Sequence, residues 1–225
     1  MQNRYDRLID FFRAGEAIGF SQFELSHIVT QQMFEGFNPG AWAVSSVHDP
    51  CPHPERPSNP GKPSRLSSTD PEARAAAGPY NKALLHSLEL LVPYARKRDV
   101  RLGFETRVHY GEIPSFEEMG WLLDYFDDPT VGFWLDTGHA QVLANLGFHP
   151  LVDWLRAYSQ RLIGVHFHDV RGLRDHLIPG MGGIDFSKVA RFLPPEVVRT
   201  CEFDWYFTED EIRRGVDCLR EVGCA

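Results

Sequence analysis

The chain has 225 residues, and its 31 acidic and 23 basic side chains give a formal net charge of -8 at neutral pH. This acidic balance does not supply the general attraction to phosphates on which nucleic-acid binding depends, and no apolar run approaches the roughly 20 residues of a membrane-spanning helix. The four cysteines lack paired metal-type spacing, and no N-terminal segment combines basic residues with an apolar run. We therefore expect reduced thiols, a cytoplasmic location and no membrane partner.

The first part of the chain predicts few regular elements. Apolar spacing indicates a helix over residues 5–18. Two short strand candidates follow, at 20–27 and 41–48, and each ends on a histidine. Residues 49–79 are dense in proline, serine and charge, which is typical of a long surface loop. A helix is predicted next, over residues 80–98.

From residue 101 onward, strands and helices alternate. The strand candidates are 101–105, 131–136, 162–169 and 197–202. The predicted helices are 115–126, 150–158, 185–193 and a last one that begins near Thr208 and ends at Gly223; capping boxes open the first and the last. Residues 171–183, rich in glycine and charge, are expected to form a loop. This alternation predicts an α/β protein with a parallel sheet of six recognisable strands, in a single domain over residues 1–225.

Four of these strand candidates end on side chains that bind metals: Glu105, Asp136, His166 and Glu202. They are separated by about one strand-plus-helix unit each, and the carboxyl ends of parallel strands meet at one edge of a sheet. We therefore expect the four to lie at one level. Three carboxylates and one imidazole suit Mn²⁺ or Mg²⁺ and tolerate Co²⁺ or Zn²⁺.

The order and spacing of several motifs resemble the xylose isomerase-like barrel superfamily, the sugar isomerase and epimerase group that also includes the endonuclease IV type of repair enzyme. The motifs are Phe23-Glu-Leu, residues 66–74, Gly103-Phe-Glu105, Leu135-Asp-Thr-Gly-His139, Val165-His-Phe-His-Asp169, residues 176–186 and Cys201-Glu202. The resemblance implies a (β/α)₈ TIM-type barrel with one divalent ion held by Glu105, Asp136, His166 and Glu202. An acidic residue three positions after the ligand, here Asp169, selects His166 over His168. In related epimerases the two metal-bound glutamates transfer protons, which assigns catalysis to Glu105 and Glu202.

Other polar residues are expected around the substrate. His139, three positions after Asp136, is placed to hold a substrate oxygen or to orient a ligand. His168 is expected to support the site from the same strand, with its side chain facing away from the pocket or into it. A substrate phosphate or carboxylate would meet Arg107, Arg171 or Arg174.

The chain also departs from the family pattern. A strand before the first helix and a strand between residues 66–74 and the helix at 80–98 are not recognised, so the barrel is expected to be shortened, with exposed sheet edges. A second copy in a homo-oligomer or a rearranged segment would cover them.

Three functions follow. The leading one is a divalent-metal-dependent isomerase or epimerase of a sugar, sugar phosphate or polyol derivative, acting through a metal-stabilised enediolate, with a dehydratase as a near relative. The second is an endonuclease IV-like metal-dependent hydrolase, although the net charge argues against a nucleic-acid partner. The third is a degraded, non-catalytic barrel that acts as a binding or assembly subunit.

Overall fold

A computed structural model describes residues 4–26, 28–48, 85–109 and 112–225. All six predicted strands are present in it. They are β1 (Phe23–Leu25), β2 (Val44–Val47), β3 (Leu102–Glu105), β4 (Val131–Asp136), β5 (Leu162–Phe167) and β8 (Val198–Cys201). The predictions for residues 49–79 and for the start of the helix at 80–98 lie outside the described residues.

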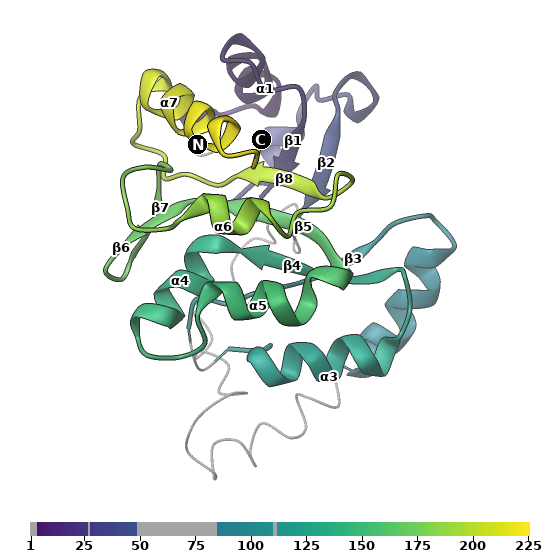
Figure 1. The fold of residues 1–225 in the computed structure, drawn as a ribbon. Helices are drawn as coiled ribbons and strands as arrows, with labels where there is room; N and C mark the ends of the chain where they lie inside the picture. Colours follow the sequence, from purple (N-terminus) through teal and green to yellow (C-terminus); the bar gives the residue numbers. More distant parts are fainter. Residues whose placement is uncertain (1–3, 27, 49–84, 110–111) are drawn as a thin grey trace, which may run out of the picture.

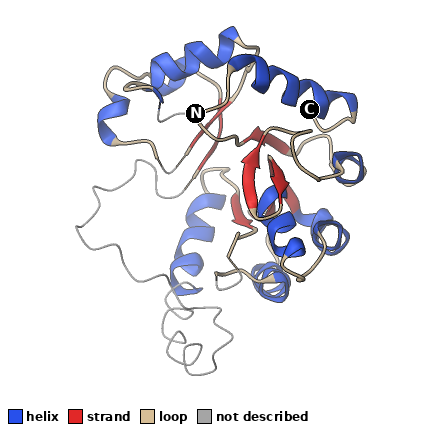
Figure 2. Cartoon of the chain, turned by 90° about the vertical axis from the view of Figure 1, so that its left-hand side faces the viewer, coloured by secondary structure: helices blue, strands red, loops and turns tan. Residues whose placement is uncertain are grey.

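The six strands are all parallel and form two sheets. β1 pairs with β2, and the other four form a sheet in the order β3-β4-β5-β8. Among the described residues no strand ladder joins the two sheets, so the barrel is not closed there. Figure 2 shows the strands at the centre of the molecule with the helices around them. The α/β class and the parallel sheet that the sequence predicts are therefore confirmed.

The helices cover the outside of the strands (Figure 1). They are α1 (Leu8–Ala17), a helix over residues 85–96, α3 (Phe116–Phe126), α4 (Thr137–Asn145), α5 (Leu151–Tyr158), α6 (Phe186–Ala190) and α7 (Glu209–Glu221), with short 3₁₀ turns at Gln31–Phe34, Pro39–Ala41 and Ser159–Arg161. None of the helices in the described part of the chain is long and apolar enough to cross a membrane.

Both predicted capping boxes are present. The Ser115 hydroxyl accepts a hydrogen bond from the backbone N–H of Glu118, whose carboxylate accepts one from the N–H of Ser115. Thr208 and Glu211 make the same exchange at the start of α7. Each box satisfies two N–H groups that the first turn of a helix leaves without partners.

Two elements differ from the sequence prediction. α4 begins directly after β4, where the sequence predicted no helix, because the Asp136 carboxylate caps it by accepting from the N–H of His139. The loop predicted over residues 171–183 contains the second strand of a hairpin, in which β6 (Asp169–Arg171) pairs antiparallel with β7 (Arg174–Leu177).

The main core lies between the four-stranded sheet and the helices that cover it. Phe133 and Val165 of the sheet and Trp154 and Leu155 of α5 are almost completely buried there. A second apolar cluster packs α1 against β1. Successive side chains of a strand point to opposite faces of the sheet. The strand residues that do not enter these apolar clusters therefore point to the other face, where the polar site is found.

Candidate metal centre

The four side chains predicted at the strand ends lie together in the structure. The Nδ1 atom of His166 is 3.0 Å from Oε1 of Glu105, 3.1 Å from Oε2 of Glu202 and 3.6 Å from Oδ2 of Asp136. His166 and Asp136 are almost completely buried, and both glutamates are largely buried. Residues far apart in the sequence therefore place three carboxylates around one ring nitrogen.

Strand register brings these residues to one level. Asp136 of β4 is paired with His166 of β5, and the N–H of Glu202, directly after β8, donates to the carbonyl of Phe167 at the end of β5. Glu105 is the last residue of β3, next to β4 in the sheet. The carboxyl ends of adjacent parallel strands thus carry the whole cluster, which is where α/β proteins place their sites.

The charges in the cluster depend on one another. Burial disfavours a charged His166, but the carboxylates of Glu202 and Glu24 and hydrogen bonds to Asp136 and Glu105 outweigh it and raise the pKa of the imidazole well above its ordinary value. Burial also opposes ionisation of Asp136, but nearby histidines hold the pKa of that carboxyl well below its usual range. Without a metal, the cluster therefore consists of carboxylates around an imidazolium.

The donor set fits a divalent cation. One ring N–H can form a good hydrogen bond with one acceptor, and Glu105 occupies this position at Nδ1. The buried Oε2 of Glu202 has no hydrogen-bond partner among the described residues, although it points toward the same nitrogen. A cation in contact with several of these oxygens would satisfy that atom, and hard oxygen donors with one imidazole suit Mn²⁺ and Mg²⁺.

Two further histidines hold Asp136. His168 is completely buried, and its Nε2 lies 2.8 Å from Oδ1 of Asp136, while its Nδ1 accepts a hydrogen bond from the backbone N–H of His176. These partners fix the tautomer with the proton on Nε2. The Nδ1 atom of His139 lies 2.9 Å from the carbonyl oxygen of Thr106, which requires a proton on that nitrogen. Both predicted residues thus lie beside the cluster, with His168 bound to a carboxylate.

Three residues near the cluster had no assigned site role in the sequence. Glu24 contacts the Nε2 side of His166. One ring nitrogen of His48 lies within 4.8 Å of potential metal-ligand atoms of Glu105, His166 and Glu202. His176 stacks on His168, with 4.2 Å between ring centroids. The signal that could have pointed to Glu24 is a single charge between two apolar residues in Phe23-Glu24-Leu25. If both faces of that strand are buried, the face opposite Phe23 and Leu25 has to accommodate the carboxylate.

The three predicted arginines lie in different parts of the structure. Arg107 lies at the cluster, with Nη1 3.3 Å from Oε2 of Glu105. Arg171 donates to the carbonyl oxygen of Met181, and Arg174 donates to the Tyr206 hydroxyl. Both of these side chains are bound to exposed loop residues, so Arg107 is the predicted arginine that the structure brings to the four clustered residues.

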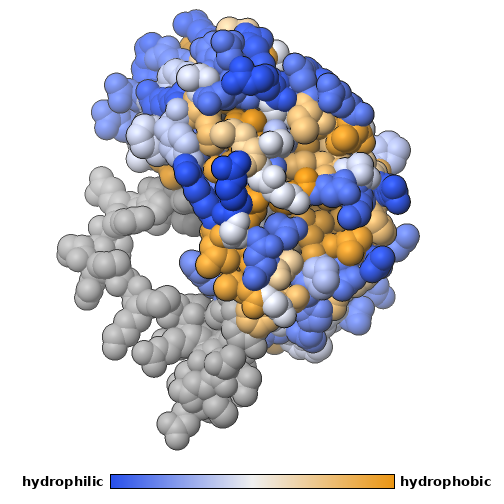
Figure 3. Space-filling view, turned by 60° about the vertical axis from the view of Figure 1, so that its left-hand side comes forward, coloured by the Kyte–Doolittle hydropathy of each residue, from blue (hydrophilic) through white to orange (hydrophobic). Residues whose placement is uncertain are grey.

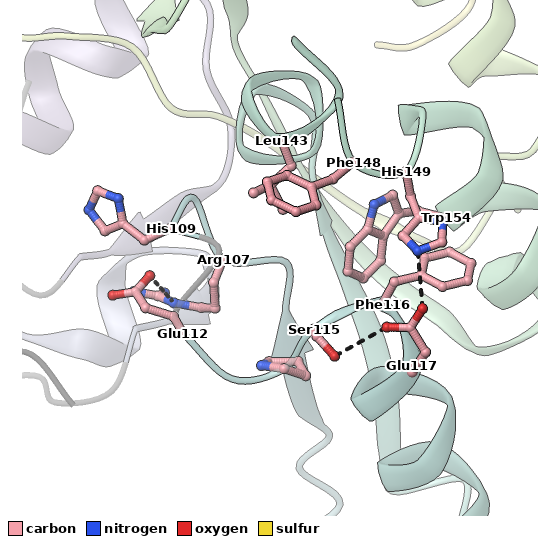
Figure 4. A pocket seen from close by; sticks show the side chains of 11 residues that line it. Arg107, His109, Glu112, Ser115, Phe116, Glu117, Leu143, Phe148, His149 and Trp154 are labelled. Carbon is pink, nitrogen blue, oxygen red and sulfur yellow. Dashed lines mark hydrogen bonds and ion pairs between the residues drawn. The ribbon is translucent and has the colours of Figure 1, made fainter. Parts of the chain in front are cut away.

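A cavity of about 160 Å³ lies next to Arg107. Figure 4 shows Arg107 and Glu112 on one side of it and the rings of Phe148, Trp154 and Phe116 on the other. None of the four clustered residues lines this cavity. It therefore adjoins the cluster through Arg107 without containing it.

The loops after β5 and β8 expose apolar side chains on the side of the molecule that lies on the left in Figure 1. Leu173, Trp205 and Tyr206 belong to them, and Trp205 is 54% exposed, whereas Phe203 is buried. In Figure 3 hydrophobic residues gather over the middle of this side, with hydrophilic residues among and around them.

Comparisons with known proteins agree on the fold. A family model described as the xylose isomerase-like TIM barrel matches residues 58–222. Solved structures with the same fold include a D-tagatose 3-epimerase-like protein (TM-score 0.64, 16% identity, covering 96% of this chain and 93% of that one). They also include D-psicose 3-epimerase from Clostridium cellulolyticum H10 (0.61, 15%, 95% and 92%) and a xylose isomerase domain protein from Alicyclobacillus acidocaldarius (0.64, 16%, 97% and 94%). No curated protein sequence matches the chain significantly.

Proposed function

The chain belongs to the xylose isomerase-like TIM barrel family, and on that basis we propose that it is a divalent-metal-dependent isomerase or epimerase of a small sugar. The observation that carries the proposal is the convergence of Glu105, Asp136 and Glu202 on Nδ1 of His166. These four residues would hold one ion, with Mn²⁺ or Mg²⁺ favoured by the predominance of oxygen donors.

The reaction is a proton transfer next to a carbonyl group. A bound ion would polarise the carbonyl of a chelated ketose and stabilise the enediolate that forms when the adjacent carbon loses its proton. Glu105 and Glu202 belong to different strands, so each can approach the substrate from its own direction. One takes the proton from carbon and the other returns it, to the opposite face in an epimerase or to the neighbouring carbon in an isomerase.

Neighbouring side chains prepare Glu105 and His139 for this task. The pKa of Glu105 is lowered: burial opposes its ionisation, but the hydrogen bond and charge of His166 outweigh that effect. The carboxylate is thus available as a base. Arg107, 3.3 Å from Oε2 of Glu105, holds the same carboxylate in place and carries the positive charge nearest to it on the side of the cavity. His139, whose Nδ1 proton is held by Thr106, keeps Nε2 as an acceptor for a substrate hydroxyl.

Ketohexoses and ketopentoses are the first substrates to test, because proteins with this fold include D-psicose 3-epimerase and L-ribulose 3-epimerase. The protein would be incubated with D-tagatose, D-psicose or L-ribulose in D₂O, with Mn²⁺ or with a chelator. We expect a metal-dependent epimer or isomer that carries deuterium on a carbon next to the carbonyl.

Glu202→Gln should abolish this exchange. Glu209→Gln, which changes an exposed glutamate at the start of α7, should leave it unchanged. Metal-dependent incision of an abasic-site duplex without any sugar turnover would instead select the hydrolase. Absence of both activities, together with tight oligomerisation, would select the binding subunit.

A further inference from the structure

Glu24 is a buried carboxylate that is not one of the four clustered residues. It lies in the middle of β1, and its side chain is 6% exposed. The flanking residues Phe23 and Leu25 enter the apolar cluster under α1, so Glu24 points to the opposite face of the strand. A buried carboxylate is costly unless it is paired and hydrogen-bonded. The partners of Glu24 therefore indicate what it does.

Groups from both sheets contact this carboxylate, and His48, directly after β2, also has its Nε2 3.5 Å from Oε1. Its Oε1 lies 3.0 Å from Nε2 of His166 on β5, and its Oε2 lies 3.2 Å from the same nitrogen. The hydroxyl of Ser46 on β2 donates to Oε2 over 2.5 Å. Ser46 thus holds the carboxylate on one side while the carboxylate holds the imidazole on the other.

The ring of His166 separates Glu24 from the cluster. Glu105 and Glu202 contact Nδ1, whereas Glu24 contacts Nε2. Because the two nitrogens lie on different edges of the ring, Glu24 is on the side of the imidazole that faces away from Glu105 and Glu202. An ionised carboxylate only accepts hydrogen bonds, so Nε2 carries a proton toward Glu24. Without a metal Nδ1 carries a second proton toward Glu105, and a cation that displaces that proton would find the Nδ1 lone pair directed at it while Glu24 keeps the proton on Nε2.

We propose that Glu24, held by Ser46, is a positioning residue that fixes the orientation and tautomer of His166 for metal binding. The inference rests on the proposed function, because it takes Nδ1 of His166 as a metal ligand. Metal-bound histidines commonly donate their other ring N–H to a carboxylate, which increases their basicity and fixes their direction. Here the carboxylate is 142 residues away in the sequence and belongs to the β1–β2 sheet. The small sheet thereby contributes to the site without supplying the ligand.

Metal affinity tests this role without depending on turnover. Mn²⁺ binding would be measured by calorimetry for the wild type, Glu24→Gln, Ser46→Ala and Ser45→Ala. Ser45 is the matched control, because its hydroxyl donates to the carbonyl oxygen of Phe23 in the same strand pair. Melting of the metal-free proteins would show that each variant folds, and the visible spectrum of the Co²⁺ forms would report on the ligand field.

We expect Glu24→Gln to weaken Mn²⁺ binding about 10–100-fold and to change the Co²⁺ spectrum. Ser46→Ala should have a smaller effect in the same direction, and Ser45→Ala should have none. If Glu24→Gln does not fold, the Mn²⁺ affinities of Ser46→Ala and Ser45→Ala decide whether the positioning role holds.

Unchanged affinity and spectrum in Glu24→Gln, with normal binding by the wild type, would overturn the positioning role and leave the proposed function standing. Equal losses in Ser46→Ala and Ser45→Ala would overturn it too, as a general effect of the strand pair. A wild type that binds no Mn²⁺ would refute the proposed function and this inference with it.

Discussion

Nδ1 of His166 lies 3.0 Å from Oε1 of Glu105, although the two residues are 61 positions apart in the sequence. The contact joins β5 to β3 across the intervening strand β4. It shows that the carboxyl ends of these strands meet at one point. The predictions below follow from the charges and the packing at that point.

Metal binding should depend on pH. The pKa of His166 is raised well above its ordinary value, since burial is outweighed by Glu202 and Glu24. A cation that uses Nδ1 must then displace a proton at neutral pH. We expect the Mn²⁺ affinity to rise by up to about tenfold per pH unit between about pH 6 and pH 8. Calorimetry in buffers of different ionisation enthalpy would count the released proton. An affinity that is flat across this window would contradict the assignment.

The stability of the metal-free protein should fall as the pH rises. Burial disfavours a charged His176, but its hydrogen bond to Asp175 and nearby carboxylates raise its pKa from 6.5 to about 9. A group whose pKa is raised by folding stabilises the folded state fully at pH values below its pKa in the unfolded chain. This contribution is lost as the pH rises through its pKa in the folded protein. His166 acts in the same direction. Urea unfolding from about pH 6 to pH 10 should show the decline, and His176→Gln should make it shallower. A stability that increases over this range would be inconsistent with both shifts.

Asp169 should be important for stability. Its buried carboxylate accepts backbone hydrogen bonds from Val170, Gly180, Gly182 and Ile184. Asp169→Ala would leave several of these donors without a partner, at about 1–3 kcal/mol each. We therefore expect a loss of at least about 3 kcal/mol in the free energy of unfolding.

The control for Asp169 is Asp185→Ala. That carboxylate is exposed and binds Ser187 and Lys188 at the start of α6. Its removal should lower the free energy of unfolding much less than removal of Asp169 does, because its interactions are screened by solvent. Equal losses in the two variants would show that the loop does not depend on Asp169.

Gly164 should tolerate no side chain. A Cβ atom there would lie 2.1 Å from the indole ring of Trp134, which contacts the imidazole of His166. We expect Gly164→Ala to destabilise the fold by about 1–3 kcal/mol and to weaken Mn²⁺ binding. At Gly183 the nearest atom is 3.9 Å away, so Gly183→Ala should be nearly neutral. Similar thermal unfolding of the two variants would mean that Trp134 can move aside.

Local sequence signals predicted the frame of the protein well. The capping boxes at Ser115 and Thr208 were predictable because both partners lie within four residues. The strands that end at Glu105 and Asp136 were predictable because an apolar run stops on a charge. The order of such strands also predicted which polar residues would lie close together.

Features that depend on distant partners were not predictable in the same way. α4 begins with Thr137 and Gly138, which are poor helix formers, and the helix is fixed by burial and by the cap at Asp136. The local pattern around Glu24 could mark it as a charge on a buried strand, but its partner is 142 positions away, so no local pattern could assign its role. The hairpin of β6 and β7 was hidden because its residues are charged and its turn contains Gly172 in a left-handed conformation.

The central claim is that the four strand-end residues hold one divalent ion, and Mn²⁺ titration of the wild type beside Glu105→Gln and Glu202→Gln tests it most directly. We predict one ion per chain for the wild type, with binding weakened at least about tenfold in each variant, while Glu209→Gln binds like the wild type. No bound ion, or binding that neither Glu105→Gln nor Glu202→Gln affects, would contradict the account.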